Sequence, residues 1–265
     1  KINLKNKNLK NFISILITNY NKGRFLNKTL KGLKAQQFSN FEIIIYDDCS
    51  DDNSVKLIKK FKSVKLIQNL KRKNYTPAQN QIIGIIECFK ISKGNILCLL
   101  DADDFFFKKK LFFVNDFFEK NPNLNSLFNL PKASNNQFSM KKRKNMKSIW
   151  PTIIPTSCIS FRRSFFLKFM NFVMLKKYKY LEVDARISIF SFFFYNEFNL
   201  IDKKLTMYNY DANGITANIH KLTRIWWLRR MQSFSYLKFI LKKKKKPFSI
   251  SLDYLTTKLI NCIVN

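Results

Sequence analysis

Acidic side chains, which can bind metal ions, accept hydrogen bonds and move protons, are scarce in this chain and lie in clusters. Of 265 residues, 49 are Lys or Arg and only 17 are Asp or Glu, which gives a formal net charge of +32. More than half of the acids fall in three clusters: Asp47, Asp48, Asp51 and Asp52; Asp101, Asp103 and Asp104; Glu182 and Asp184. Negative charge has therefore either been placed for a function or survived where acids elsewhere were lost.

The sequence DADD at 101–104 is the sharpest of these signals. It follows the apolar run 96–100, so its carboxylates lie at the end of an expected strand. Alternate carboxylates in that position can hold a hard divalent cation such as Mg²⁺ or Mn²⁺, and such a cation can neutralise a departing diphosphate. Asp is also a common helix N-cap and turn residue. Three acids so close together in so basic a chain favour ligand binding over that alternative.

The first acidic cluster is paired with the sequence TNYN at 18–21. Tyr20 follows one expected strand and could stack on a flat base. Asp47 and Asp48 follow the next strand and could accept a hydrogen bond from a base N–H or a ribose hydroxyl. Alternatively, Tyr20 lies at the edge of the core and the acids cap a turn. Taken alone, this pair of motifs leaves both interpretations open.

The third cluster, Glu182 and Asp184, lies at the start of an expected helix. Residues two apart on a helix do not share a face, so one carboxylate should point inward and the other outward. A general base would need a carboxylate within reach of a substrate hydroxyl and free of tight pairing. Complementation of the helix dipole is the alternative, and without further context it is the better interpretation.

Alternating strands and helices must position these clusters. Apolar runs at 12–18, 41–46, 64–68 and 96–100 are typical of buried strands, and helical patterns lie between them at 21–37, 52–61 and 77–92. The alternation predicts an α/β fold with a mostly parallel sheet and helices on both faces. Ligands bind beyond the carboxyl ends of such strands, which is where the first two clusters fall.

The pattern is weaker after residue 120. The polar stretch 121–147 is expected to be a loop. Further elements follow in order: a strand at 156–161, a helix at 163–172, a helix at 181–194, a strand at 200–208 and a basic, aromatic, helical stretch at 217–246. The 46% of hydrophobic residues exclude disorder as the main state, and the single histidine, His220, nearly excludes His-based zinc sites and Ser-His-Asp triads.

Together, these motifs resemble family 2 glycosyltransferases, which have the GT-A fold. The matching segments are ISILITNYNKGRFLNKTLKGL at 13–33, QQF at 36–38, FEIIIYDDCSD at 41–51, Asn80, GNILCLLDADD at 94–104, SFRR at 160–163 and EVD at 182–184. The likeness is close up to residue 104 and looser beyond it. It implies a GT-A-type, Rossmann-like, mostly parallel sheet over 1–216, with a nucleotide-sugar half at 12–120 and an acceptor half at 121–216. A basic helical extension at 217–265 follows.

The resemblance also implies roles for single residues. Thr18, Tyr20 and Asp48 would hold the nucleotide base with support from Asp47, and Asn21 and Asn80 would lie in the same nucleotide site. Asp101 and Asp103 would contact ribose and a divalent metal, Mn²⁺ or Mg²⁺, and Asp104 would contribute to that metal site. Asp184 would be the general base, with Glu182 as the second choice. The expected reaction is an inverting transfer from a nucleotide-diphosphate sugar to a glycan or lipid-linked acceptor of the cell envelope, in the cytoplasm at the inner face of the membrane.

Two positions depart from the family pattern. Many members carry basic residues facing the diphosphate in a YRxH-like segment, but here the corresponding residues 208–211 read YNYD. Lys71, Arg72 or His220 are candidates to compensate. Cys49 also replaces the glycine of the family's DDGS turn.

Other functions are weighed against this one. A charge of +32 attracts nucleic acid, but it explains neither the acidic clusters nor the order of the strands. A receiver-like phosphoacceptor is disfavoured because its acids should end the first and third strands. The sequence IWWLRR at 225–230 and the lysines at 242–246 could lie on an anionic membrane. Alternatively, this segment packs its aromatic residues on the core and leaves its lysines in water.

Overall fold

The computed structural model describes residues 11–133, 154–209, 211, 214 and 219–264. The part of the expected loop from 134 to 147 lies outside these residues. The described chain forms an eight-stranded mixed sheet in the order β3-β2-β1-β4-β7-β6-β8-β5. Its strands are β1 Ile13–Asn19, β2 Phe41–Asp48, β3 Val64–Asn69, β4 Ile96–Asp101, β5 Phe105–Phe106, β6 Ser126–Ala133, β7 Ile159–Arg162 and β8 Leu200–Tyr208.

The first four strands are parallel and follow the predicted alternation of strands and helices. β1 lies between β2 and β4. In this register Thr18 is the partner of both Tyr46 and Asp101, and Asn19 is the partner of Asp47. The carboxyl ends of β1, β2 and β4 therefore bring the TNYN turn and the first two acidic clusters to one edge of the sheet.

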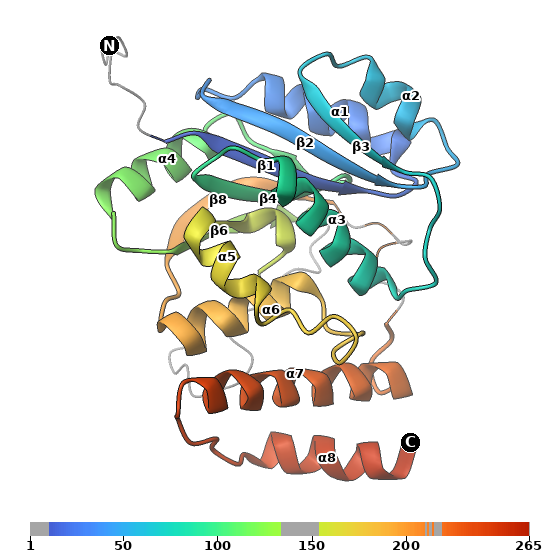
Figure 1. Cartoon of the computed structure of the whole chain (residues 1–265), viewed down its shortest axis with the longest axis vertical. Coiled ribbons are helices and arrows are strands. Elements are labelled where there is room, and N and C mark those ends of the chain that lie inside the picture. Colours follow the sequence, from blue (N-terminus) through green and yellow to red (C-terminus); the bar gives the residue numbers. More distant parts are fainter. Residues whose placement is uncertain (1–10, 134–153, 210, 212–213, 215–218, 265) are drawn as a thin grey trace.

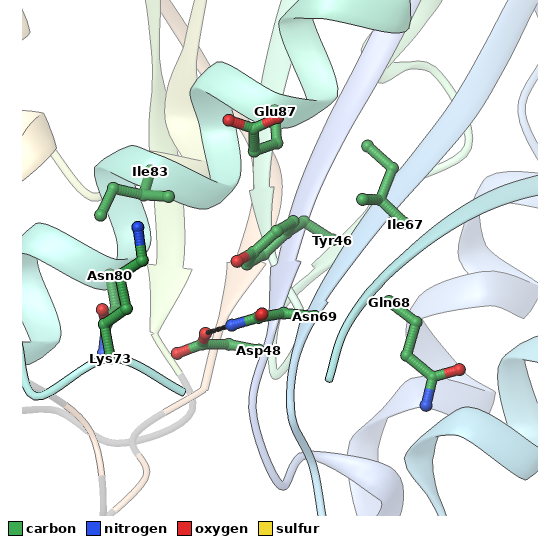
Figure 2. Close-up of a pocket in the computed structure, with 9 residues that line it drawn as sticks. All are labelled: Tyr46, Asp48, Ile67, Gln68, Asn69, Lys73, Asn80, Ile83 and Glu87. Carbon is green, nitrogen blue, oxygen red and sulfur yellow. Dashed lines mark hydrogen bonds between the residues drawn. The ribbon is translucent and has the colours of Figure 1, made fainter. Parts of the chain in front are cut away.

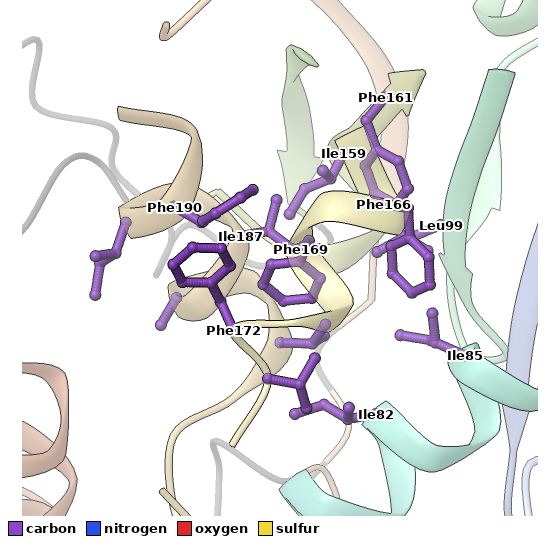
Figure 3. Packing of buried hydrophobic residues seen from close by; sticks show 14 of the residues in the cluster. Ile82, Ile85, Leu99, Ile159, Phe161, Phe166, Phe169, Phe172, Ile187 and Phe190 are labelled. Atoms are coloured by element: carbon purple, nitrogen blue, oxygen red, sulfur yellow. The ribbon is translucent and has the colours of Figure 1, made fainter. Parts of the chain in front are cut away.

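Helices cover both faces of the sheet, as predicted (Figure 1). Alternate strand residues point to opposite faces, so Ile15 and Ile45 belong to one core and Leu16 and Ile44 to the other. The first core includes residues of α1 Gly23–Lys34, α2 Ser54–Lys59 and α4 Lys110–Lys120. The second includes residues of α3 Pro77–Ile91, α5 Arg163–Met170, α6 Val183–Phe190 and α7 Arg224–Lys243. Figure 3 shows its aromatic centre, in which Phe161, Phe166, Phe169, Phe172 and Phe190 pack together.

The prediction of a loop across 121–147 was wrong for the part that the structure describes. β6 occupies Ser126–Ala133 and pairs with both β7 and β8. Its polar residues have partners inside the protein, because Ser126 bonds Ser191 at 2.6 Å between hydroxyl oxygens, and the side chain of Asn129 accepts from Lys110. Pairing within the tertiary structure therefore outweighed local polarity. The strand expected at 156–161 is a 3₁₀ turn, Thr156–Cys158, followed by β7.

Helix α3 begins as the sequence TP at 76–77 predicts. Thr76 caps it: the Thr76 hydroxyl accepts from the Gln79 amide N–H at 3.3 Å, and the Gln79 side chain accepts from the Thr76 N–H at 3.0 Å. Gly84 allows the helix to lie against the sheet, since a Cβ there would be 2.8 Å from Thr18 Cγ2. This close approach places the first turns of α3 beside the ends of β1 and β2.

The last described segment is an antiparallel pair of helices below the sheet domain (Figure 1). The helix α6 continues as a π-helical turn at Ser191–Tyr195, and α7 packs against both. The side chains that α7 buries include Phe234, Tyr236, Leu237 and Ile240. The second helix, α8 Leu252–Val264, packs on the outer side of α7. Within the described ranges, none of the helices is both long and apolar enough to cross a membrane.

Candidate functional site

The second and third acidic clusters meet around Tyr208, at the end of β8. Burial raises the pKa of the Tyr208 hydroxyl, and the charges of Asp104, Asp101, Asp184 and Asp103 raise it further. Four carboxylates from two clusters about 80 residues apart in sequence therefore lie close enough to act on one hydroxyl. The first cluster follows β2, which lies on the other side of β1 from β4, so it is two strands away along the same edge of the sheet.

Asp47 holds the turn that follows β2. Its carboxylate is fully buried and accepts from the Asn19 side chain at 2.6 Å, the Ser50 amide N–H at 3.0 Å and the Ser50 hydroxyl at 2.7 Å. Cys49, which replaces the family's glycine, has a φ of 62° and thus keeps the left-handed backbone with a side chain present. Asp47 therefore supports the shape of the turn from inside.

Asn21 joins the same turn to the end of β1. Its backbone N–H donates to the Ser50 hydroxyl at 2.9 Å, and its side-chain oxygen accepts from the Asp51 N–H at 3.0 Å. Asn21 has a φ of 53°, a conformation that Asn tolerates better than most residues. The two turns are thereby fixed to each other, with Tyr20 exposed between them.

Asp48 and Tyr20 are joined by Arg72. Asp48 accepts from the Asn69 side chain at 3.0 Å and from Arg72 Nε at 2.9 Å. The guanidinium carbon of Arg72 is also 3.6 Å from the centre of the Tyr20 ring. A flat, hydrogen-bonding group thus already stacks on Tyr20 and donates to Asp48, which are the two contacts a nucleobase would use there.

A pocket of about 270 Å³ opens beside Asp48 (Figure 2). Its lining comes from α3, β2, β3 and the segment after β3: Tyr46, Asp48, Ile67, Gln68, Asn69, Lys73, Asn80, Ile83 and Glu87. The side-chain nitrogen of Asn80 is buried and has no hydrogen-bond partner among the residues that the structure describes. A buried amide without a partner is costly, so a ligand atom that accepts from Asn80 would be favoured in this pocket.

The three acids of the DADD motif have different surroundings. Asp101 accepts from the Gln81 side chain at 2.8 Å, and burial, then Asp103, raises its pKa to about 7. Both oxygens of the buried Asp104 accept hydrogen bonds, one from the Ser157 hydroxyl at 2.6 Å and one from the Asn209 N–H at 2.8 Å. Asp104 therefore ties the motif to the end of β8.

Asp103 shares an ammonium group with Asp211. Lys22 Nζ is 2.9 Å from Asp103 and also contacts Asp211, which pairs with Arg24 at 2.7 Å. Burial alone would lower the pKa of Lys22, but the charge of Asp103 and the contacts with Asp211 raise it above its ordinary value. Asp211 ends the YNYD segment, so this chain carries an acid where many family members are basic, with Lys22 and Arg24 beside it.

Asp103 and Asp211 are the carboxylates that best suit a divalent metal. They converge on one positive charge, and oxygen ligands suit Mg²⁺ and Mn²⁺. In the described ranges, no three or more His, Cys, Asp or Glu side chains gather closely enough to hold a metal by themselves. Mg²⁺ is commonly held by one or two carboxylates together with substrate phosphates, so this pair fits a metal that arrives with a phosphorylated ligand.

Glu182 and Asp184 have different surroundings, but neither points outward to open solvent as their spacing predicted. Glu182 is 4% exposed and accepts from Arg229 of α7; burial raises its pKa to about 7 although Arg229 opposes the shift. Asp184 is half-buried and accepts from the Ala185 N–H at 2.7 Å. Burial raises the pKa of Asp184, and its charge acts on Asp101. Asp184 therefore faces the DADD motif, whereas Glu182 fastens α6 to α7.

Several site residues had no signal in the sequence that we recognised. Lys22 directly follows the TNYN motif, and Gln81 is one residue from Asn80, so position along the chain could have suggested both. Asp211 lies in a segment read only as a departure from the family. Arg72, considered for the diphosphate, lies instead at Tyr20 and Asp48.

Comparison with known proteins extends these observations. The model of the family described as Glycosyl transferase family 2 matches residues 14–202. An uncharacterized glycosyltransferase of Rickettsia bellii is 35% identical over 109 residues, which are 41% of this chain and 15% of that protein. An uncharacterized glycosyltransferase of Haemophilus influenzae is 34% identical over 121 residues, 46% of this chain and 39% of that protein. The matches thus span less than half of these relatives.

A named relative and two solved structures add to the comparison. The Escherichia coli UDP-Glc:alpha-D-GlcNAc-diphosphoundecaprenol beta-1,3-glucosyltransferase WfaP is 33% identical over 100 residues, 37% of this chain and 38% of that protein. S. aureus TarS 1-349 in complex with UDP-GlcNAc superposes with a TM-score of 0.67 at 16% identity, covering 96% of this chain and 71% of that one. The mannosyltransferase PcManGT from Pyrobaculum calidifontis, in complex with GDP-Man and Mn2+, gives 0.55 at 11% identity, covering 94% and 69%. These likenesses confirm the predicted GT-A-type α/β fold.

Proposed function

Because the chain belongs to glycosyl transferase family 2 and is a glycosyltransferase, we propose that it moves a sugar from a nucleotide-diphosphate sugar to an acceptor hydroxyl with inversion. The observation that supports this best is that Asp48 and Asp103 lie at strand ends on one edge of the sheet, while Asp184, at the start of α6, lies close enough to the second cluster for its charge to act there. Each belongs to a different acidic cluster, and each has surroundings suited to a different part of the reaction.

The nucleotide binds at the ends of β1 and β2. The base stacks on Tyr20 and donates an N–H to Asp48, taking the place that the Arg72 guanidinium now holds. Asn80 offers its unpartnered amide from α3, and Thr18 lies at the end of β1 between these groups and Asp101. Asp47 and Asn21 hold the two turns and support the base site from behind. Asp101 is placed to accept from a ribose hydroxyl.

The diphosphate lies over Asp103. Asp103 and Asp211 would hold a divalent metal, which supplies positive charge that stabilises the departing diphosphate. Lys22 contacts both carboxylates and provides positive charge from the chain itself, in a site that lacks the basic residues common at 208–211. Asp104, with both oxygens bonded to Ser157 and Asn209, positions the motif and takes no part in the metal site that we propose.

Asp184 is the general base. The acceptor oxygen forms a bond to the anomeric carbon while the bond from that carbon to the diphosphate oxygen breaks, and the hydroxyl proton passes to Asp184. The transition state has oxocarbenium character. A raised carboxylate pKa strengthens a base, because efficiency improves as the pKa approaches the working pH. Glu182 is less suited, since Arg229 occupies one of its oxygens.

The acceptor is a glycan of the cell envelope, carried on a lipid, and the enzyme acts in the cytoplasm at the inner face of the membrane. The name of the E. coli relative, which specifies a diphosphoundecaprenol acceptor, supports this choice of acceptor class. In our proposal residues 12–120 bind the donor and residues 121–216 bind the acceptor, with the extension at 217–265 beside them.

A nucleotide screen tests the proposed function directly. We expect one nucleoside diphosphate to raise the melting temperature, and Mn²⁺ to increase that rise, because a ligand that binds only the folded state stabilises it. The matching sugar nucleotide should then be hydrolysed slowly without acceptor. If no nucleoside diphosphate binds with or without metal, the proposal is wrong.

A further inference from the structure

Helix α8 turns its large aliphatic side chains away from the protein. Leu252, Leu255, Leu259 and Ile263 are 83%, 49%, 64% and 75% exposed. Their spacing of three and four residues places them along one side of an α-helix. We call these four residues the α8 stripe. Figure 1 shows α8 as the outermost layer of the structure, beyond α7, and the stripe is on the solvent-exposed side of this helix.

The opposite side of α8 is held to α7 by polar contacts. Tyr254, Thr257 and Asn261 are buried there. The Asn261 side chain donates to the Trp227 carbonyl at 3.0 Å, and Lys238 Nζ donates to the Tyr254 hydroxyl at 2.6 Å. The Tyr254 ring also packs on Phe234 of α7, so α8 faces α7 with polar and aromatic groups and leaves these aliphatic residues outward, whereas a surface helix usually turns its apolar side inward. An apolar stripe of this kind on an ordered helix marks a contact surface.

Positive charge lies next to this stripe. Lys242 and Lys243 end α7 and Lys244–Lys246 begin the connection to α8; all five are exposed, and Lys258 is exposed on α8 itself. A helix with aliphatic residues on one side and lysines beside them suits an anionic lipid surface, where the chains contact acyl groups and the lysines contact headgroups. A second copy of this chain fits less well, because it would bring two such lysine turns and two chains of charge +32 together.

We propose that the α8 stripe inserts into the interfacial region of an anionic membrane, with Lys242–Lys246 at the lipid phosphates. The sequence left open whether 225–246 contacts a membrane or packs on the core; the structure packs much of α7 against the core, and the exposed aliphatic residues that we assign to the membrane are those of α8. This surface is independent of donor chemistry, so it stands or fails separately from the proposed transfer reaction.

Vesicle co-sedimentation of the full chain tests the proposal. The wild-type protein should sediment with vesicles containing phosphatidylglycerol and much less with pure phosphatidylcholine, and added salt should weaken the binding. The double variant Leu255→Glu/Leu259→Glu should bind the vesicles more weakly. Each substitution removes one aliphatic side chain from the lipid contact and should lower the affinity roughly tenfold or more. The control is Leu167→Glu on α5, where an equally exposed leucine, at 50%, receives the same change; it should bind as the wild type does.

Two further measurements separate the alternatives. Melting temperature without vesicles should be similar for the double variant and the wild type, since the substituted side chains are exposed, and this shows that lost binding is not lost folding. Sedimentation velocity without vesicles should give the same mass for both. A wild-type dimer that becomes monomeric in the double variant would overturn the proposal in favour of self-association, as would unchanged vesicle binding by the double variant.

Discussion

Arg72 holds its guanidinium carbon 3.6 Å from the centre of the Tyr20 ring while its Nε donates to Asp48 at 2.9 Å. The proposed base site is therefore filled by one of the chain's own side chains before a nucleotide arrives. Binding a base requires Arg72 to leave both partners, and it can then turn toward the phosphates. Arg72 would therefore compete with the nucleobase for Tyr20 and Asp48 and, once displaced, attract the diphosphate.

The first prediction separates these two effects. Arg72→Ala should bind the uncharged nucleoside of the donor several-fold more tightly, because a cation–π contact of about 0.5–2 kcal/mol no longer has to be broken. The same variant should gain less, or lose affinity, for the nucleoside diphosphate. Calorimetric titration of both ligands gives the comparison. Lys62→Ala, which changes an exposed lysine that is not a candidate for the diphosphate, is the control, and equal changes for nucleoside and diphosphate would contradict the idea.

The second prediction concerns the cation between Asp103 and Asp211. Lys22→Met should bind Mn²⁺ roughly tenfold more tightly without donor, since a competing positive charge has been removed from two carboxylates. It should nevertheless transfer sugar more slowly, because Lys22 also offsets charge on the diphosphate. Mn²⁺ binding followed by electron paramagnetic resonance, together with transfer rates, measures both. Lys31→Met alters an exposed lysine on the same helix and should change neither; if Lys22→Met leaves Mn²⁺ affinity unchanged, the pair does not hold the metal.

The third prediction tests the general base. Asp184→Asn should keep nucleotide affinity and lose transfer by about 10²–10⁴-fold, the usual contribution of a positioned base. In the wild type, kcat/KM should rise with pH through a pKa above the ordinary aspartate range, because burial raises the pKa of Asp184 and the base must be ionised. The control is Asp202→Asn on the exposed part of β8. Loss of nucleotide binding in Asp184→Asn would indicate a structural role instead.

The fourth prediction concerns the stability of the contact between α6 and α7. The pKa of Glu182 is raised from 4.5 to about 7 in the folded protein, so between these values the folded state keeps a proton that the unfolded state has released. Stability from this group is complete below pH 4.5 and is lost as the pH rises to 7. Glu182→Gln cannot titrate and does not lose this stability. The melting temperature of the variant minus that of the wild type should therefore increase by several degrees when the pH is raised from 5 to 7.5. A constant difference across that range would show that the pKa is not raised.

The first half of the fold was predictable because each local pattern agreed with the tertiary structure. The runs that became β1, β2 and β4 are mostly apolar and buried, as strands covered on both faces require, and the edge strand β3 alternates less buried apolar residues with exposed polar ones. β6 was missed because Ser126 and Asn129 look like loop residues, and their partners Ser191 and Lys110 come from other parts of the chain. Strand pairing of this kind depends on contacts that a local window does not contain.

The site was predictable in outline for a related reason. The ends of parallel strands meet at one edge, so the first two acidic clusters could be brought together from their positions alone. The pairing of these acids with their partners could not be predicted: Lys22 and Asp211 are 189 residues apart, and although Lys22 follows the TNYN motif, no local pattern joins it to Asp103 or Asp211. The orientation of α8 was equally hidden, since its periodicity defines an apolar side but not which side faces the protein.

The contact between Glu182 and Arg229 makes the helical pair part of the working enzyme. Arg229 belongs to α7, yet it is the cation that accompanies a buried carboxylate two residues before Asp184. A chain shortened before α7 would keep every strand of the sheet but leave Glu182 without that cation, at the start of the helix that carries the proposed base. If α8 binds the membrane as we propose, α7 connects that contact to the start of α6, because α8 packs on α7 and Arg229 of α7 contacts Glu182. Membrane attachment would then also fix the position of the proposed base.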